Sequence, residues 1–352
     1  MVLPLIGVTL YYVLAVEPHR NGDLGRLGFI PFDDSYEPRI MKMGMDSLYI
    51  TYTDNLTDLS CDSSILTIGD SFSQMGKWGY QNRLAELYPN HNVYFFTYTL
   101  GSVPGDAVTN NYQCFIDKLI NDEPLPRIVI LECVEREIAR RLNDLKFYPR
   151  KEAVATAAEP TFDSNSFPQA GEVKQKNWLT LLSENKEELK KKICNTQEYV
   201  RKHLNIDNPV KHLKLRDGLF SCNGSENDLY FVRDDLNEVS EEIREGSKLK
   251  LDSLLSLTEQ KGIQFVPLVA SDKYDLYKDF TIKDTYRKSG LLAIYEQYNS
   301  DPRFLNSKEL LYPHIKQGEK DIYKCDDTHW SPIASRYVAA EIKRRLDLLE
   351  RL

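Results

Sequence analysis

Apolar runs of strand length alternate with segments of helical period from residue 64 onward, and this alternation constrains the fold more than any other feature of the sequence. The runs predicted to be strands are Ile65–Ile68, Val93–Thr99, Ile128–Val134 and Phe265–Ala270. Residues 74–89 and 108–122 lie between them and repeat apolar side chains at helical spacing. Strands that are apolar on both faces and separated by helices are typical of a parallel sheet covered on both sides. The sequence therefore predicts a three-layer α/β/α, doubly wound parallel sheet.

The middle of the chain interrupts this alternation. Residues 143–235 are polar, contain the loop-like stretch EPTFDSNSFPQAGE, and then show long charged segments of helical character. We therefore expect a polar, largely helical insertion within one α/β domain of residues 21–352. The last segment, residues 331–352, predicts a helix with Ser331 as its N-cap and Pro332 in its first turn.

The N-terminus begins with the apolar stretch MVLPLIGVTLYYVLAV. A helix that spans a membrane needs about 20 such residues, and the polar EPHRNGDLGR that follows reads as a linker. We therefore expect residues 1–20 to be a membrane anchor or an uncleaved signal segment. This would place the body of the protein on the periplasmic or extracellular face of the membrane. A buried N-terminal helix or strand is the alternative interpretation.

Net charge and cysteine spacing limit the classes of ligand. The formal net charge is −8 and the basic residues are scattered, so nucleic acid is not expected as a partner, because phosphate binding needs a concentrated basic face. No two of the six cysteines have the spacing of metal ligands, and we expect neither a metal nor a cofactor. Cys194 and Cys222, both in the polar middle segment, are the pair best suited to a disulfide.

Polar residues follow three of the predicted strands, at the edge of a parallel sheet where ligands bind. They are Gly69-Asp70-Ser71 after the first strand, Gly101 at the end of the second, and Glu132 at the end of the third, with Arg136 one helical turn later. Gly69 permits a tight turn, and Ser71 would open the following helix with its N–H suited to an oxyanion. An ordinary turn that caps a helix is the alternative interpretation.

A serine nucleophile needs an adjacent base, and His329 is the best candidate among the six histidines. It precedes the well-capped final helix, and Asp326 and Asp327 lie immediately upstream. A nearby carboxylate can fix the imidazole tautomer and stabilise its charged form. A plain loop before a helix is the alternative. The two motifs together predict a hydrolase-type site, provided that the fold brings Ser71 and His329 together.

The stretch ILTIGDSFS and the distant DDTHWSP together resemble the SGNH/GDSL hydrolase superfamily. The sequence is most similar to its AlgX/AlgJ-like branch, the alginate O-acetyltransferase-like proteins, through GDSFS, VILECVERE and VPLVASDKYDLY. The resemblance covers residues 64–134 and 235–342. In the alginate enzymes the Asp-x-His motif precedes Gly-Asp-Ser, whereas here it follows. The resemblance therefore does not extend to alginate as the substrate.

Carried over by position, the resemblance implies that Ser71 is the nucleophile, His329 the base and Asp327 the orienting acid. The Asp-x-x-His spacing of common SGNH hydrolases would choose Asp326 instead. The implied oxyanion donors are the N–H groups of Ser71 and Gly101. The candidates for substrate binding are Asp70, Glu132, Arg136 and Trp330. A buried structural ion pair is the alternative role for Glu132 and Arg136.

The expected activity is that of an O-acetyltransferase or acetylesterase that acts through an acyl-serine on surface or exported polysaccharide. The resemblance also implies a membrane-bound acyl-transfer partner. The alternative is a catalytically silent protein of the same fold that binds polysaccharide or assists its assembly, because 21 Tyr, 14 Phe and 3 Trp offer many candidates for sugar stacking. A nucleotide-binding protein is disfavoured, because the first strand is followed by neither G-x-G-x-x-G nor a P-loop.

Overall fold

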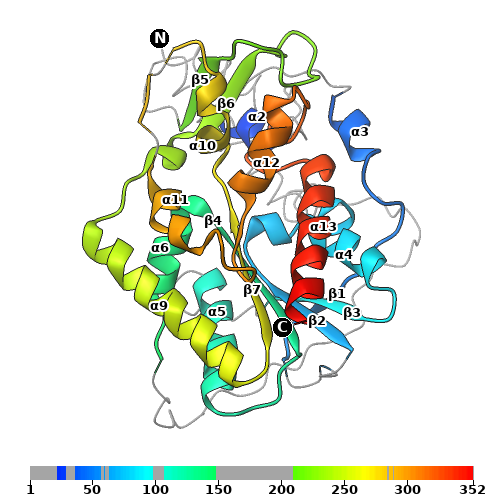
Figure 1. Cartoon of the computed structure of the whole chain (residues 1–352). Coiled ribbons are helices and arrows are strands. Elements are labelled where there is room, and N and C mark those ends of the chain that lie inside the picture. The colour runs from blue at the N-terminus through cyan, green and yellow to red at the C-terminus, as the bar shows by residue number, and fades with distance from the viewer. Residues whose placement is uncertain are drawn as a thin grey trace, which may run out of the picture.

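A six-stranded parallel sheet forms the centre of the structure (Figure 1). The computed structural model describes residues 22–28, 36–56, 59, 63–97, 107–147, 209–283, 285–287 and 289–351. The strands are β1 (Thr51–Thr53), β2 (Ser64–Ile68), β3 (Asn92–Phe96), β4 (Ile128–Val134), β7 (Gln264–Ala270) and β8 (Leu305–Asn306). Their order in space is β1-β3-β2-β4-β7-β8, and every neighbouring pair is parallel.

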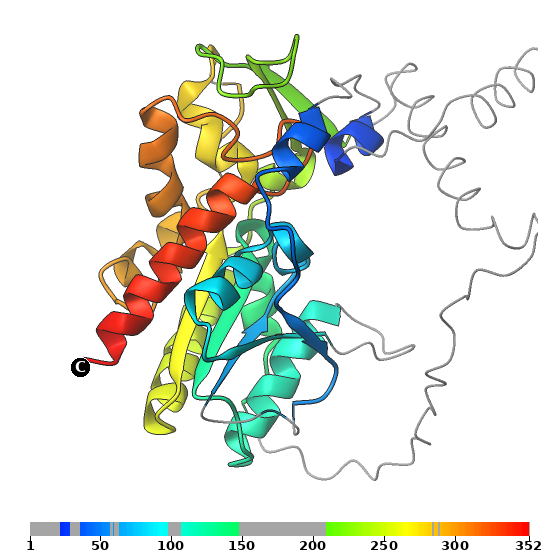
Figure 2. The same ribbon diagram turned by 90° about the vertical axis from the view of Figure 1, so that its right-hand side faces the viewer.

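Helices cover both faces of this sheet. One face packs on α4 (Tyr80–Leu87), α12 (Ser307–Lys316) and α13 (Pro332–Leu349), and α13 lies alongside α4 (Figure 2). The other face packs on α5 (Ala107–Ile120), α6 (Glu135–Asp144) and α9 (Glu241–Gln260). Because neither face meets water, every residue of β2 and β4 is buried. The predicted three-layer α/β/α arrangement is confirmed.

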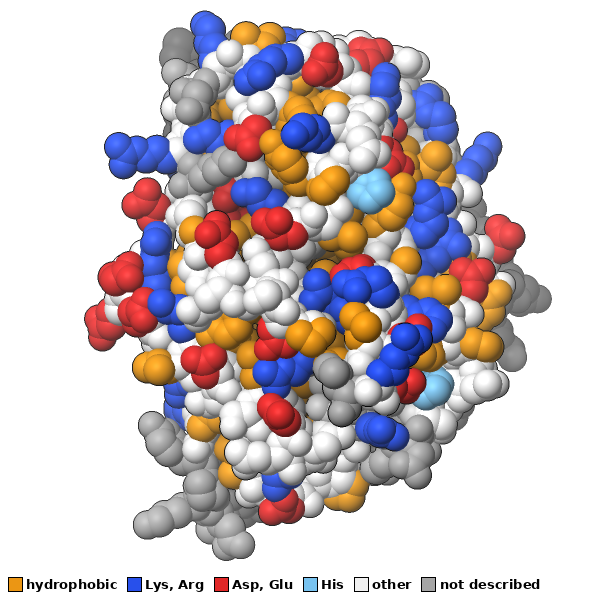
Figure 3. Space-filling view, in the orientation of Figure 1, with side chains coloured by type: hydrophobic (Ala, Val, Ile, Leu, Met, Phe, Trp, Pro, Cys, Tyr) orange, Lys and Arg blue, Asp and Glu red, His pale blue; other side chains and the backbone are white. Residues whose placement is uncertain are grey.

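Shorter elements surround these layers. The remaining α-helices of the described residues are α2 (Asp23–Gly28), α3 (Tyr36–Met41), α10 (Lys273–Tyr277) and α11 (Leu291–Ile294). The 3₁₀ turns are η1 (Ser71–Ser73), η2 (Gly76–Trp78), η3 (Arg233–Leu236), η4 (Lys278–Phe280) and η5 (Glu296–Tyr298). The strands β1 and β8, which have no counterpart among the predicted runs, are the short edges of the sheet. On the face shown in Figure 3, charged side chains of both signs are interspersed.

Residues 209–235, the described end of the predicted insertion, form an antiparallel hairpin rather than helices. Its strands are β5 (Val210–Lys214) and β6 (Asp228–Val232). Leu229 and Phe231, two residues apart on β6, are both buried in the core, and this spacing of two is the signature of a strand. The hairpin lies with α2 and α10 at the end of the molecule where the sheet strands end (Figure 1). Residues 148–208 lie outside the described part of the chain.

The segment read as a linker is instead part of the folded domain from Gly22 onward. The helix α2 packs against both strands of the hairpin, and Leu24 is fully buried. No helix among the described residues has both the length and the apolarity needed to cross a bilayer. The predicted anchor, residues 1–20, lies outside the described residues.

The Cys194–Cys222 bridge stays a prediction, because only one of its two cysteines is described. Cys222 is a buried thiol. Burial, and then a hydrogen bond from the Cys222 side chain, raise the pKa of the buried Cys325 thiol. Spacing along the chain does not show which buried loop a cysteine will face, so the sequence alone could not pair them. Cys194 lies outside the described residues.

Candidate active site

The strand order reverses between β2 and β4. The chain passes from β2 to β3 on one side and then returns to β4 on the other side of β2. Ligands in open α/β sheets bind at the carboxyl ends of the strands at such a reversal. Gly69 to Ser73 follow β2 at this position, and Glu132 lies near the end of β4. The predicted nucleophile is therefore at the switch point of the sheet.

The nucleophile turn, Gly69–Ser73, is a tight bend that requires glycine at its first position. A Cβ at position 69 would lie 2.2 Å from Ser73 Oγ and 2.4 Å from Glu132 Oε2. Ser71 begins a single 3₁₀ turn rather than the longer helix that the sequence suggested, so no helix dipole of useful length points at it. Ser71 is exposed, whereas the next two residues of the turn, Phe72 and Ser73, are buried.

Asp70 links the nucleophile turn to the strand β4 and the helix α6. Its Oδ1 accepts a hydrogen bond from Phe72 N at 3.1 Å, and its Oδ2 accepts one from Val134 N at 3.0 Å. The guanidinium of Arg141 on α6 pairs with Oδ2 at 2.7 Å. Asp70 is 4 % exposed, so the structure assigns this predicted substrate contact to the interior.

Glu132 also holds the nucleophile turn, through hydrogen bonds to two of its residues. Its Oε2 accepts hydrogen bonds from Asp70 N at 3.0 Å and from Ser73 Oγ at 2.8 Å. Burial, and then the charge of Asp70, raise the pKa of Glu132 well above its usual value, which favours the protonated acid. Glu132 is fully buried, so it positions the turn and does not face a substrate.

The base loop, Lys324–His329, is the tip of a short β-like ribbon that leads into α13. Tyr323 and Trp330 form an antiparallel bridge, and Lys324 N donates to His329 O at 3.2 Å. Ser331 caps α13 by accepting a hydrogen bond from Ile333 N at 3.0 Å, which confirms the predicted N-cap. The ribbon and the capped helix fix the base loop from both ends.

Asp327 is the carboxylate that holds His329. Its Oδ1 lies 2.5 Å from His329 Nδ1 and also accepts the His329 backbone N–H at 3.0 Å. Its Oδ2 pairs with Lys324 Nζ at 2.6 Å. Burial raises the pKa of Asp327, but Lys324 and His329 outweigh it and the pKa lies well below the usual value. Burial lowers the pKa of His329, but the hydrogen bond and charge of Asp327 raise it above 6.5 overall.

Asp326, the alternative acid, has a different partner. Its Oδ2 accepts a hydrogen bond from Gly22 N at 3.1 Å. A Cβ at position 22 would lie 2.4 Å from Asp326 O, so this close approach requires glycine. The neighbouring Asp23 accepts Thr328 N at 2.8 Å, and its Oδ2 lies 4.0 Å from His329 Nδ1. The N-terminal segment thus holds the base loop from outside.

Lys273 holds the base loop from inside. Its Nζ donates to the carbonyl oxygens of Lys324 at 2.7 Å, Cys325 at 3.0 Å and Asp327 at 3.1 Å. Burial lowers the pKa of Lys273 to about 8. Three backbone acceptors around one ammonium group fix the path of the loop, so Lys273 is a positioning residue for Asp327 and His329.

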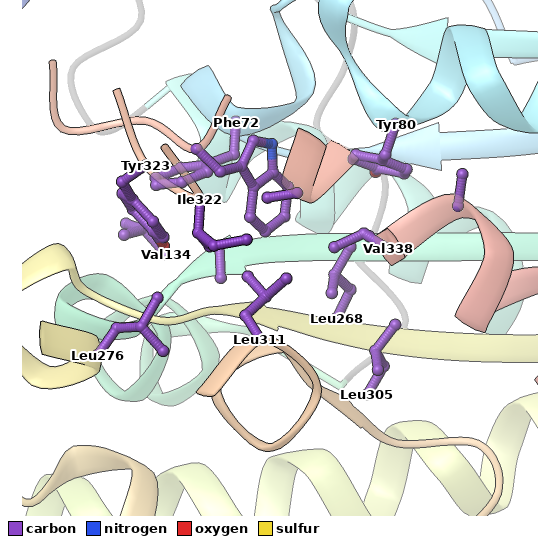
Figure 4. Packing of buried hydrophobic residues seen from close by; sticks show 14 of the residues in the cluster. Phe72, Tyr80, Val134, Leu268, Leu276, Leu305, Leu311, Ile322, Tyr323 and Val338 are labelled. Atoms are coloured by element: carbon purple, nitrogen blue, oxygen red, sulfur yellow. The ribbon is translucent and has the colours of Figure 1, made fainter. Parts of the chain in front are cut away.

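The nucleophile turn and the base loop meet through Phe72. The ring centroid of Phe72 lies 4.8 Å from that of His329 and 4.9 Å from that of Trp330. Phe72 also lies beside Tyr323 in the core (Figure 4). Trp330 is fully buried, so this predicted substrate contact is a core residue. The fold thus brings the turn that carries Ser71 into contact with the loop that carries His329.

The atoms that would react have no partner within the described residues. His329 Nε2 is buried and accepts or donates no hydrogen bond there, and neither Oγ nor the N–H of Ser71 has a hydrogen bond to another described residue. A buried ring nitrogen without a partner is costly, so Nε2 is suited to receive a hydroxyl proton. In unliganded enzymes such contacts often tighten only when the substrate binds. Gly101, the second predicted oxyanion donor, lies outside the described residues.

Arg136 is an internal ion-pair residue. Its Nη1 lies 2.5 Å from Asp272 Oδ1 and 3.3 Å from Asp235 Oδ1. Two carboxylates thus surround one guanidinium, which leaves little net positive charge for an acidic sugar. Arg136 pairs with these residues and not with Glu132, so the predicted Glu132–Arg136 pair is absent.

Asp23, Asp327 and His329 also offer the atoms of a metal site, which all lie within 4.8 Å of one another. Two ligands of one tetrahedral metal ion lie about 3 Å apart, whereas Asp327 Oδ1 and His329 Nδ1 are 2.5 Å apart. The Lys324 ammonium on Asp327 would also repel a cation. The arrangement fits a carboxylate–imidazole hydrogen bond better than a metal centre.

Two supporting residues, Asp23 and Arg141, had no signal in the sequence. A third, Lys273, lies in the stretch VPLVASDKYDLY that carries the resemblance, but no role was predicted for it. Each acts across a long separation, and single charged residues in polar stretches resemble ordinary surface positions. Comparison of the chain with protein-family models, with curated proteins and with solved structures gave no match. The geometry of this site and its motifs are therefore the basis on which a function can be proposed.

Proposed function

We propose that this chain is an extracytoplasmic carbohydrate O-acetyltransferase or acetylesterase of the SGNH type, acting through an acyl-serine at Ser71. The observation that carries the proposal is the His329–Asp327 pair, at 2.5 Å, with its imidazole against Phe72, the residue next to an exposed serine. A nucleophile, a base and an orienting acid in this arrangement are the general requirement for serine acyl transfer.

The reaction would begin when His329 Nε2 takes the proton of Ser71 Oγ. The oxygen then attacks the carbonyl carbon of an acetyl ester, and the N–H of Ser71 would stabilise the resulting oxyanion. His329 returns the proton to the leaving alkoxide, which leaves an acetyl-serine. A sugar hydroxyl or water, deprotonated by the same Nε2, then takes the acetyl group. General-base assistance of this kind is worth about 10²–10⁴-fold in rate.

Asp327 has a defined role in these steps. By accepting the proton on His329 Nδ1, it leaves Nε2 as the basic nitrogen and stabilises the imidazolium that forms. Lys324 on the other carboxylate oxygen favours the ionised Asp327 throughout. The predicted choice of Asp327 over Asp326 is therefore part of the proposal.

The sequence supports the proposed location and substrate class. The apolar stretch MVLPLIGVTLYYVLAV at the start of the sequence supports a position on the outer side of a membrane, and the resemblance to the alginate O-acetyltransferase-like proteins supports acetylated polysaccharide as the substrate. A membrane-bound protein that supplies acetyl groups is the proposed partner.

A polysaccharide-binding protein on the same fold is the second candidate. The observation that favours it is that His329 Nε2 has no hydrogen-bond partner in the described part of the chain, so Ser71 is not engaged by the base. On this alternative, Ser71→Ala would leave glycan binding intact and no ester would be turned over.

Turnover of p-nitrophenyl acetate by the full chain distinguishes the two. We expect hydrolysis that falls to background in Ser71→Ala and in His329→Ala. The matched controls are Ser253→Ala, an exposed serine on α9, and His91→Ala, each expected to retain wild-type rates. Equal rates in all five proteins would contradict the proposed site.

A further inference from the structure

Two buried cysteines face each other beside the base loop. Cys222 lies in the loop between β5 and β6, and Cys325 lies two residues before Asp327. Both are 0 % exposed and belong to the same hydrophobic cluster. A hydrogen bond from the Cys222 side chain is one of the causes that raise the pKa of the Cys325 thiol, after burial. Disulfide formation requires such neighbouring side chains on backbones that are close together.

The backbones that carry the two cysteines are joined by contacts independent of sulfur. Ser221 N donates to Asp321 Oδ1 at 2.9 Å, and Tyr36 O–H donates to the same oxygen at 3.2 Å. The hydroxyl oxygen of Tyr36 also accepts Cys325 N at 3.0 Å. Through Tyr36 and Asp321, the residue before Cys222 is therefore linked to the backbone of Cys325. This framework joins the two loops that carry the cysteines.

The remaining described cysteines have other surroundings. Cys133 lies in β4, and its sulfur accepts a hydrogen bond from Arg141 at 3.3 Å. Cys114 lies on α5 and is partly exposed. They provide matched controls for chemistry at Cys222 and Cys325.

We propose that Cys222 and Cys325 form a disulfide that fastens the base loop to the β5–β6 hairpin. The two thiols lose two protons and two electrons to an external disulfide, such as oxidised glutathione or a thiol oxidase. One Cys thiolate attacks that disulfide to give a mixed disulfide, and the second displaces the other thiol. One Cys–Cys bond forms and two thiols of the oxidant are released. Because both sulfurs are buried in the folded state, the bond forms during folding.

Such a bond would add a covalent restraint two residues from Asp327. The loop that it closes is long, and cross-links across long loops restrict the unfolded chain most. The restraint would also complement Lys273, which binds the Cys325 carbonyl oxygen at 3.0 Å. This inference does not depend on the chemistry proposed for Ser71.

The test is peptide mapping of the full chain folded in a buffer of oxidised and reduced glutathione, denatured and alkylated without reduction. We expect a linked pair of peptides containing Cys222 and Cys325, lighter by two hydrogen atoms than the sum of the free peptides. The link should persist in Cys114→Ser and disappear in Cys222→Ser, with Cys325 then alkylated. Full alkylation of both residues in the wild type, or a link from Cys222 to Cys194, would overturn the proposal.

A second measurement does not require the single variants to fold. Dithiothreitol should lower the Tm of the oxidised wild type. The double variant Cys222→Ser/Cys325→Ser, once folded, should show no change in Tm with the same reductant. An unchanged Tm of the wild type after complete reduction of the mapped bond would contradict its role as a restraint on the folded chain.

Discussion

The nucleophile turn and the base loop present the two halves of one site, but they are held in different ways. Glu132 and Arg141, which support the nucleophile turn, belong to the strand and helix next to it, β4 and α6. The supports of the base loop come from far along the chain, from Gly22, Asp23 and Lys273. The nucleophile turn is thus held by the neighbouring strand and helix of the sheet. The base loop is held by residues that are far apart along the chain.

The electrostatics of the two halves also differ. Beneath the nucleophile turn, burial and Asp70 raise the pKa of Glu132, so a neutral acid supports the serine. In the base loop, Lys324 and His329 lower the pKa of Asp327 below its usual value, so an ionised carboxylate supports the base. The turn needs hydrogen-bond geometry, and the loop needs a fixed negative charge.

The largest expected effect separates the two aspartates of the base loop. Asp327→Asn removes the carboxylate charge beside His329 Nδ1 and allows the wrong imidazole tautomer. We therefore expect kcat for p-nitrophenyl acetate to fall by about 10²–10⁴-fold. Asp326→Asn should change kcat far less, because Asp326 binds Gly22 N rather than the imidazole. Equal losses in the two variants would contradict the assignment of the acid.

The next effect tests how the nucleophile turn is held. Arg141→Met leaves Asp70 buried without its cation, and breaking a buried pair costs about 3–5 kcal/mol of unfolding free energy. Arg140→Met is the matched control, because Arg140 is adjacent on α6 and pairs with Glu137 at the surface; a change of about 0–1 kcal/mol is expected there. Urea unfolding of both proteins measures the difference. Similar values for the two variants would show that the Asp70–Arg141 pair does not hold the turn.

A smaller effect is expected for the support of the base loop. Lys273→Met leaves three carbonyl oxygens without their donor, and we expect a loss of about 1–3 kcal/mol in unfolding free energy with a disproportionate loss of kcat. The exposed Lys320→Met serves as the control for removal of a lysine nearby. If Lys273→Met retained wild-type kcat, the loop would not depend on that ammonium group.

The smallest expected effect is a shift in pH dependence. Because Asp327 raises the pKa of His329 above 6.5, kcat/KM should rise with pH through a pKa above 6.5 as the imidazole loses its proton. The raised pKa also means that protonated His329 stabilises the fold at low pH, and that this contribution is lost as pH rises through the folded pKa. In Asp327→Asn the titration should move to lower pH. NMR titration of the His329 ring in both proteins measures this shift, and identical pKa values would contradict the coupling.

The contrast between local and distant supports also explains which features could be predicted from the sequence. The apolar runs placed β4 at its observed bounds and β2 and β7 within one residue of theirs, because strands buried on both faces leave a continuous apolar signal. The turn at Gly69 and the N-cap at Ser331 depend on local backbone chemistry and were likewise readable. For these elements a few neighbouring residues determine the structure.

The supports of the base loop were not readable. The contact of Gly22 and Asp23 with residues 326–328 spans most of the chain, and no local pattern indicates it. The hairpin β5–β6 was obscured because its outward residues are polar and its buried set is only every second position. A substrate role for Asp70, Glu132 and Trp330 was suggested by their places in the motifs, but burial assigns these residues to the interior.

The most direct test of whether the base loop serves the nucleophile turn is the labelling of Ser71 by a fluorophosphonate, followed by peptide mass mapping. The proposed site predicts one adduct, on Ser71, formed at least about 10²-fold more slowly in His329→Ala and at an unchanged rate in His91→Ala. Labelling at another residue, or equal labelling rates in the wild type and His329→Ala, would show that the two halves do not work as one site.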